Sequence, residues 1–192
     1  MTRKCDRLVF RASQDDVRTA RAQLPQQPFN IPNTGLGVQI HIIAIGKRMP
    51  EWVTTGYTEY AKRMPHECRL SLHEIAAGKR TPGADLERLT RDEGTRQLAA
   101  VPVGSRIVAL DQTGRAYETQ ALAQRLQKQL AAGNDLALLI GGPEGLAPQV
   151  LQRSEERWSL SALTLAHPLV RVVLAEQLYR AWSILQGLPY HR

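Results

Sequence analysis

With 192 residues, 43% of them hydrophobic, the chain is long enough to bury the core of one globular domain and carry a short appendage. Its 25 Lys and Arg residues exceed its 18 Asp and Glu residues, and the net charge of +7 suits an anionic partner such as nucleic acid. Two cysteines without metal-site or disulfide-type spacing, and no run of roughly 20 apolar residues, predict a cytoplasmic protein with neither a metal nor a membrane span.

Residues 1–37 differ in composition from the rest of the chain. Prolines recur at Pro25, Pro28 and Pro32, and no apolar period is sustained. We expect a disordered N-terminal extension here, with the natural start of the protein near Val38 and the preceding residues an upstream extension of the reading frame. Residues 38–192 would then form the one folded domain.

From residue 38 onward, strand-like and helix-like segments alternate. The expected strands are residues 39–45, 69–75, 106–110, 136–140 and 160–165, and the expected helices are residues 50–64, 84–101, 119–132 and 168–186. Residues 111–114 read as a turn, Thr119 as a helix cap, and Gly133 as a helix end. Such alternation predicts an α/β fold with a mostly parallel sheet flanked by helices.

Two segments in the last third of the chain could bind a ligand. The sequence Gly-Gly-Pro-Glu-Gly at residues 141–145 follows the strand at 136–140, but it lacks the spacing of a dinucleotide fingerprint or a P-loop. It could admit a flat, largely uncharged ligand, although the glycines alone favour a simple tight turn with a solvated Glu144. In the segment 160–165, the hydroxyls of Ser161 and Thr164 need partners in the sheet or on a ligand.

The C-terminal part of the chain carries several titratable or charged residues. His167 begins the last helix, where a packing or capping role is as consistent as an acid–base role. Arg171, Glu176 and Arg180 fit surface charge, and Arg171 and Glu176 lie five residues apart, which is not a helical pairing distance. Residues 190–192 combine a phenol, an imidazole and a guanidinium at a chain end, although termini are commonly frayed.

Several segments, taken in order, match the pattern of one family. They are Ala44-Ile45-Gly46-Lys47, Gly78-Lys79-Arg80, residues 141–145, Leu-Ser-Ala-Leu-Thr-Leu at residues 160–165, the helical run from His167, and the terminal Pro-Tyr-His-Arg. Together they closely resemble the ribosomal RNA large subunit methyltransferase H family. The likeness covers about residues 39–192, and residues 1–37 have no counterpart in it.

The resemblance implies a SPOUT-class fold whose C-terminal part threads a trefoil knot, a rare exception to the usual topology rules. It also implies a homodimer in which S-adenosylmethionine is the methyl donor. The implied substrate is N3 of a pseudouridine in 23S ribosomal RNA, within the assembled ribosome.

The resemblance further implies which residues meet the cofactor and the substrate. The cofactor is expected at the ends of three strands, namely at Leu110, Gly141, Leu160, Ser161, Ala162, Leu163, Thr164 and Leu165. We expect Arg171, His191 and Arg192 to favour the ionised base from beside its carbonyl oxygens, with Tyr190 stacking or hydrogen bonding. Positioning should dominate catalysis, because methyl transfer needs little covalent help from a protein.

Two other functions stay open from the sequence. One is a ribosome-binding or assembly factor that has the same fold but no catalytic activity. The intact segments at 141–145 and 160–165 argue against it. A nucleotide-binding hydrolase is disfavoured because the chain has no P-loop lysine and no convincing set of nucleophile, base and acid.

Overall fold

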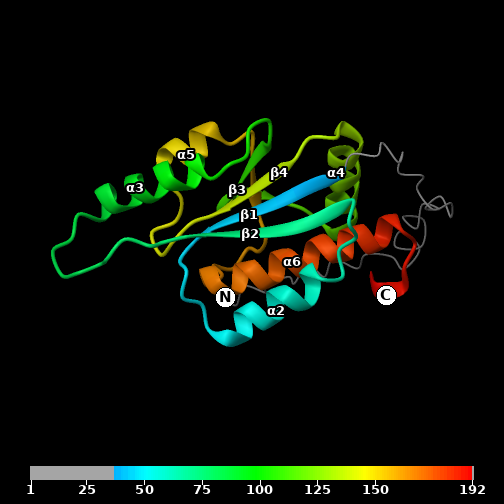
Figure 1. The fold of residues 1–192 in the computed structure, drawn as a ribbon, viewed down its shortest axis with the longest axis horizontal. Coiled ribbons are helices and arrows are strands. Elements are labelled where there is room, and N and C mark those ends of the chain that lie inside the picture. The colour runs from blue at the N-terminus through cyan, green and yellow to red at the C-terminus, as the bar shows by residue number, and fades with distance from the viewer. Residues whose placement is uncertain (1–36, 192) are drawn as a thin grey trace, which may run out of the picture.

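The computed structural model describes residues 37–191, so the expectation for the N-terminal extension lies almost entirely outside the described residues. Its sheet has five parallel strands in the order β2-β1-β4-β3-β5 (Figure 1). These are β1 (Val38–Ile45), β2 (Cys68–Ile75), β3 (Arg106–Ala116), β4 (Leu136–Ile140) and β5 (Glu156–Ser159). The predicted parallel α/β sheet is therefore confirmed.

Helices cover both faces of the sheet, as predicted. One face carries α2 (Glu51–Ala61), α4 (Thr119–Ala132) and α6 (His167–Leu185), and the other carries α3 (Leu86–Ala99) and α5 (Pro148–Arg153) (Figure 1). A short 3₁₀ helix, η1 (Pro189–His191), follows α6. None of the helices within residues 37–191 combines the length and the apolar character that crossing a bilayer requires.

The core lies on both faces of the central strands. Every residue of β4 is buried. Its adjacent residues Leu138 and Leu139 point into different apolar clusters, which lie on opposite faces of the sheet. In β1, Ile42 joins the cluster beneath α6 whereas Ile43 joins the cluster beneath α5. A strand that is buried on both faces has a continuous apolar sequence, which is why β4 could be predicted from its sequence.

Two of the expected elements, the turn after β3 and the fifth strand, are wrong. The fifth strand is Glu156–Ser159, and residues 160–165 form an irregular loop after it. Residues 111–114 are not a turn but part of β3, which continues past a bulge to pair again with β5. Gly114 permits this, because a Cβ there would lie 2.7 Å from the carbonyl carbon of Arg157.

The expected ends of α4 are half right. Gly133 ends the helix in the left-handed conformation, with φ of 73°, as a glycine cap should. Thr119 is not the cap, because Glu118 occupies that position and its side chain makes no capping hydrogen bond. The sequence reading also missed α5, whose six residues are too few for a helical period to be recognised.

Candidate active site

A cavity of about 490 Å³ opens where β4 and β5 end, beside the bulge in β3. Its wall comes from residues 110–112 at the β3 bulge, from the loop after β4, and from the segment between Trp158 and the start of α6. Carboxyl ends of parallel strands converge at one edge of a sheet, where α/β proteins commonly bind ligands. Three segments that are distant in sequence therefore form one concave site.

Nearly all of the residues expected to meet the cofactor line this cavity. They are Leu110, Gly141, Leu160, Ser161, Leu163, Thr164 and Leu165. Ala162 belongs to the same loop but is not part of the cavity wall. Residues 160–165 thus face the cavity from a loop, whereas the sequence had suggested a strand.

The glycine loop after β4 folds tightly on itself. A Cβ on Gly141 would lie 2.3 Å from the carbonyl carbon of Gly145 and 2.7 Å from the nitrogen of Leu146. Gly145 has φ of 83°, and its N–H donates to the carbonyl of Gly142 at 3.0 Å. The glycines are therefore required by the turn itself, and the turn in its folded form supplies one wall of the cavity.

The hydroxyls of the loop between β5 and α6 find partners within the protein. Ser161 Oγ accepts the N–H of Leu163 at 2.9 Å, and the hydroxyl of Ser159 donates to the carbonyl of Ser161 at 2.9 Å. Thr164 Oγ1 donates to Gln112 Oε1 at 3.1 Å, which ties the loop to β3 across the cavity. The loop therefore holds its own shape, with Leu163 76% exposed at the cavity mouth.

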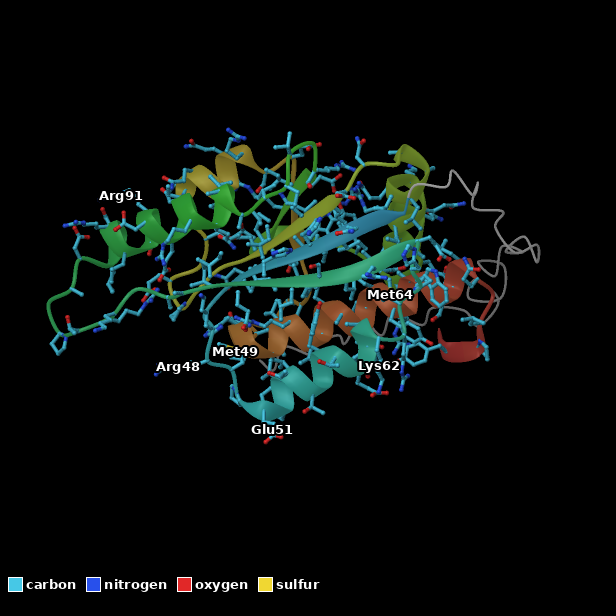
Figure 2. The ribbon with its side chains drawn as sticks, viewed as in Figure 1. Arg48, Met49, Glu51, Lys62, Met64 and Arg91 are labelled. Atoms are coloured by element: carbon cyan, nitrogen blue, oxygen red, sulfur yellow. The ribbon has the colours of Figure 1, made fainter. Side chains whose placement is uncertain are left out.

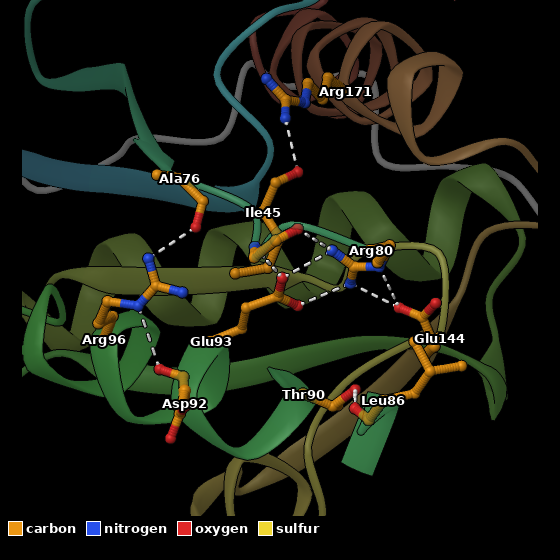
Figure 3. A network of polar contacts seen from close by, with 11 residues as sticks. Ile45, Ala76, Arg80, Leu86, Thr90, Asp92, Glu93, Arg96, Glu144 and Arg171 are labelled. Carbon is orange, nitrogen blue, oxygen red and sulfur yellow. Dashed lines mark hydrogen bonds and ion pairs between the residues drawn. The ribbon is translucent and has the colours of Figure 1, made fainter. Parts of the chain in front are cut away.

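An ion-pair network of Arg80, Glu93 and Glu144 supports the glycine loop (Figure 3). Arg80 donates to both oxygens of Glu93, at 2.9 and 3.1 Å, and to Glu144 at 2.8 and 2.5 Å. Glu93 is 2% exposed and also accepts the N–H of Gly78 at 2.7 Å. Glu144 is thus paired, contrary to a purely solvated role, and hydrogen bonding to Arg80 lowers the pKa of its carboxyl.

Replacing Arg80 by Met should destabilise the protein by about 3 kcal/mol, because it leaves Glu93 buried without its cation. We expect the lower end of the range for broken buried pairs, since the Arg80 side chain is 21% exposed. Urea denaturation checks this, with Arg88→Met as the control, because Arg88 pairs with Asp92 in solvent and its loss should cost under ~1 kcal/mol. Equal losses in both variants would contradict the network's importance.

Arg171 does not lie on the surface, contrary to the reading as surface charge. Its side chain is 1% exposed, and it donates to Glu74 at 2.5 Å and to the carbonyls of Ile45 and Gly46 at 3.0 and 2.8 Å. Glu176 pairs with Arg180, one turn away, and not with Arg171, from which it lies five residues apart. Arg171 therefore braces the carboxyl end of β1 and is not part of the cavity wall.

His167 begins α6 and lines the cavity beside this brace. Its Nδ1 is buried and has no hydrogen-bond partner among residues 37–191. Burial, followed by the charges of Arg171 and Arg80, lowers the pKa of His167 below its ordinary 6.5. The imidazole is therefore neutral at pH 7 and suited to accept or donate a hydrogen bond to a ligand.

The depressed pKa of His167 predicts a pH effect on stability. Below about pH 6.5 the unfolded chain binds a proton that the folded chain resists, so stability falls as the pH falls through this window. His167→Gln should flatten that dependence while other groups still contribute. Urea midpoints at about pH 7.5 and about pH 5.5 measure it, and an equal drop in parent and variant would show that His167 titrates freely.

The C-terminal tail lies away from the cavity of its own chain. Tyr190 donates to Glu176 at 3.2 Å and its ring packs edge-on against Tyr179, with centroids 4.8 Å apart. Figure 1 shows η1 at the opposite end of α6 from the carboxyl ends of the strands. His191 belongs to η1, and the expected role of Arg192 lies outside the described residues.

Several residues of the site escaped the sequence analysis. Asp111 and Gln112 line the cavity because β3 continues where a turn was expected. Their position directly after a buried strand was the available signal, the same signal that identified Gly141. Arg80 and Glu93 carried no comparable signal, because their contacts join a loop, a helix and the glycine loop.

The wall of the cavity combines an apolar surface with a small number of polar groups. Leucines and Trp158 form apolar surface for a flat ring system, and Gln112, Thr164 and His167 add hydrogen-bonding groups. Asp111 adds a carboxylate that accepts the N–H of Thr113 at 2.7 Å and its hydroxyl at 2.5 Å, and that forms no ion pair within residues 37–191. The described part of the chain contains no cluster of His, Cys, Asp and Glu suited to a metal ion.

Comparison with known proteins agrees with this architecture. A family profile described as "Predicted SPOUT methyltransferase" matches residues 38–191, which places the chain in the SPOUT class. Proteins named Ribosomal RNA large subunit methyltransferase H from Thioalkalivibrio sulfidiphilus and Methylococcus capsulatus are 55% and 53% identical over 155 residues. These matches cover 81% of this chain and 99% and 100% of theirs. The chain belongs to the ribosomal RNA large subunit methyltransferase H family, as the resemblance had indicated.

Among solved structures, a probable methylase family protein from Haemophilus influenzae Rd KW20 is similar at 11% identity and a TM-score of 0.48. The match covers 80% of this chain and 70% of that one.

Proposed function

We propose that the protein transfers a methyl group from S-adenosylmethionine to N3 of a pseudouridine in 23S ribosomal RNA of the large subunit. The observation that carries the proposal is the cavity where β4 and β5 end beside the bulge in β3. Its lining includes all but one of the cofactor residues that the family resemblance implies. The names of the relatives support ribosomal RNA as the substrate class. We further propose a cytoplasmic enzyme that acts on assembled ribosomes.

The cofactor would be held by the two loops that face each other across the cavity. The glycine loop at Gly141 offers close backbone approach, and Leu160 and Leu165 offer apolar contact from the opposite loop. Asp111 would attract the positive sulfonium. When bound, S-adenosylmethionine supplies an electrophilic methyl group, so the chain itself has only to bind, orient and exclude water.

The remaining task is to position the target base and favour loss of its N3 proton. That proton is weakly acidic, and a cation beside the adjoining carbonyl oxygens favours the ionised base. We propose His191 and Arg192 for this role, with Arg171 acting through its brace on the end of β1. Burial, together with Tyr60 and Glu176, raises the pKa of Tyr190, so its phenol stays protonated and serves as a hydrogen-bond donor or stacking surface.

We propose a homodimer in which the tail of one chain serves the cavity of the other. Within one chain, Tyr190 contacts the middle of α6 and not the cavity. Large apolar side chains are exposed at Trp52 in α2, at Leu163 in the loop that lines the cavity, and at Leu169 in the first turn of α6. Gly56 of α2 packs against Val172 of α6, so Trp52 and Leu169 lie at similar heights on adjacent helices and would form one apolar surface.

Light scattering at micromolar concentration should therefore give twice the mass of the 21.4 kDa chain. Replacing Trp52 and Leu169 by Glu should shift the equilibrium to monomer, because two charges would be buried in the interface. Leu86→Glu is the control, since Leu86 is 45% exposed on α3, away from this surface. A parent protein that is monomeric and fully active would overturn the dimer.

We also propose the topology and the extent of the catalytic unit. The segment from β4 to α6 would form the trefoil knot implied by the family, and residues 38–192 would be the methyltransferase domain. Residues 1–37 would be an extension that the reaction does not need.

The proposed function is tested by transfer of label from methyl-labelled S-adenosylmethionine. The purified protein would be incubated with free 23S RNA, separate subunits and whole ribosomes, each in a parallel reaction. We expect label in 23S RNA when whole ribosomes are the substrate. Cofactor binding without any transfer would instead support a ribosome-binding factor of the same fold that lacks catalysis.

A further inference from the structure

Two loops beside the cavity carry exposed basic residues. β1 and β2 are parallel neighbours, and the N–H of Gly46 donates to the carbonyl of Ile75 at 2.7 Å where the two strands end. The chain then presents Lys47 and Arg48 after β1 and Lys79 after β2, and all three are exposed. Figure 2 shows Arg48 extending away from the fold. We call these three residues the basic rim.

The first of these loops is fixed from inside by Arg171. Its guanidinium donates to the carbonyl of Gly46 at 2.8 Å, immediately before Lys47 in the chain. Gly46 has φ of 105°, which turns the chain away from β1. A buried side chain thus sets the direction in which the first half of the basic rim leaves the sheet.

The second loop is fixed in the same way by Glu93. Its carboxylate accepts the N–H of Gly78 at 2.7 Å and pairs with Arg80, so both neighbours of Lys79 are held. Arg80 also donates to the carbonyl of Gly78 at 3.0 Å. Lys79 is therefore an exposed cation on a loop that the buried network holds in place.

The charge of the basic rim is not neutralised by the protein. The nearby carboxylates of Glu74, Glu93 and Glu144 are taken up by Arg171 and Arg80. Within residues 37–191, the rim side chains form no ion pair or hydrogen bond. The acid nearest in sequence to Lys47 and Arg48 is Glu51, in the first turn of α2, and the acid nearest to Lys79 is Glu74, which pairs with Arg171. Three cations therefore face solvent on preformed loops, and β1, which bears two of them, adjoins β4 with its glycine loop.

We propose that the basic rim binds backbone phosphates of the RNA whose base enters the cavity. Exposed Lys and Arg on preformed loops are the groups that position nucleic-acid backbones, whereas base selection falls to the cavity. The proposal rests on the proposed ribosomal RNA substrate and names the surface that docks it. An acidic protein partner would need the same charge, and the test separates the two.

The test measures binding of the full chain to 23S RNA transcribed in vitro, without cofactor, from about 0.05 to about 0.3 M KCl. The triple variant Lys47→Gln, Arg48→Gln, Lys79→Gln should lower the slope of log affinity against log salt by about 2–3, since each lost phosphate contact removes about 0.7–0.9. Single variants should each lower it by about 1 and serve if the triple variant does not fold. Unchanged affinity for S-adenosylmethionine shows that the cavity is intact.

The matched control removes three cations from the amino-terminal end of the strands, opposite the basic rim, by Arg69→Gln, Lys128→Gln and Arg153→Gln. All three are exposed and carry the same total charge as the basic rim. The proposal is overturned if both triple variants lose RNA affinity equally, or if the rim variant keeps the parent slope. Failure of the parent protein to bind any ribosomal RNA would instead count against the proposed function itself.

Discussion

Deleting Tyr190, His191 and Arg192 should lower turnover on ribosomes by about 100–1,000-fold, as loss of positioning and electrostatic groups does in other enzymes. Within one chain, Tyr190 contacts Glu176, which lies about 9 Å along α6 from the cavity residue Val170. Tyr190 is therefore not part of the wall of its own chain's cavity. Single-turnover methylation, together with calorimetry of S-adenosylmethionine binding, should show the loss in turnover with little change in cofactor affinity.

Mixed dimers test whether the tail acts on the partner's cavity. A chain without the tail but with an intact cavity would be co-expressed with a Gly141→Val chain, whose tail is intact and whose cavity is disrupted. Such a dimer should recover about half of the parent activity, because one complete site forms from two defective chains. No recovery would mean that each tail serves its own chain. Parent-level turnover by the deleted homodimer would reduce the tail to an ordinary chain end.

Gly141→Val should lower the affinity for S-adenosylmethionine by about 100-fold or more, equivalent to roughly 2.8 kcal/mol of binding free energy. A side chain on Gly141 collides with the backbone of Gly145 at 2.3 Å, so the glycine loop must move and the cavity wall moves with it. The loss of affinity follows from displacement of the glycine loop and does not require the valine side chain to occupy the space of the cofactor. Calorimetry on the folded variant measures the loss.

Gly56→Ala is the control for this substitution. A Cβ on Gly56 meets the Val172 side chain at 3.1 Å, and Gly56 is not part of the cavity wall. Because a side chain can yield where a backbone cannot, this variant should bind the cofactor like the parent. Unchanged affinity in Gly141→Val would show that the glycine loop is not part of the binding site.

The fold was largely predictable because its signals are local. Apolar runs such as residues 136–140, separated by helical segments, dictate a parallel sheet whatever the details of the loops. The errors fall at one edge, where residues 111–114 extend β3 and residues 160–165 form a loop instead of a strand. Both errors depend on how β3 and β5 pair around Gly114. This is a long-range contact that the sequence of neither segment indicates.

The site was predictable only in part for the same reason. The glycine loop at residues 141–145 was recognisable because it follows a buried strand, and carboxyl ends of parallel strands converge. Leu110 was expected from the family resemblance. The buried positions of Arg171 and Glu93 could not be inferred, because a charged residue reads as surface until its partners are known. The expected catalytic role of residues 190–192 comes from the family resemblance alone and awaits the deletion described above.

The most direct test of the central claim is identification of the methylated nucleoside. Ribosomes that lack the modification would be incubated with the protein and S-adenosylmethionine, and the 23S RNA would be digested and analysed by mass spectrometry against synthetic standards. We predict a single product, 3-methylpseudouridine, which appears with the parent protein and is lost with Gly141→Val. A methyl group on a ribose hydroxyl or on another base, or no methylated product at all, would contradict the account.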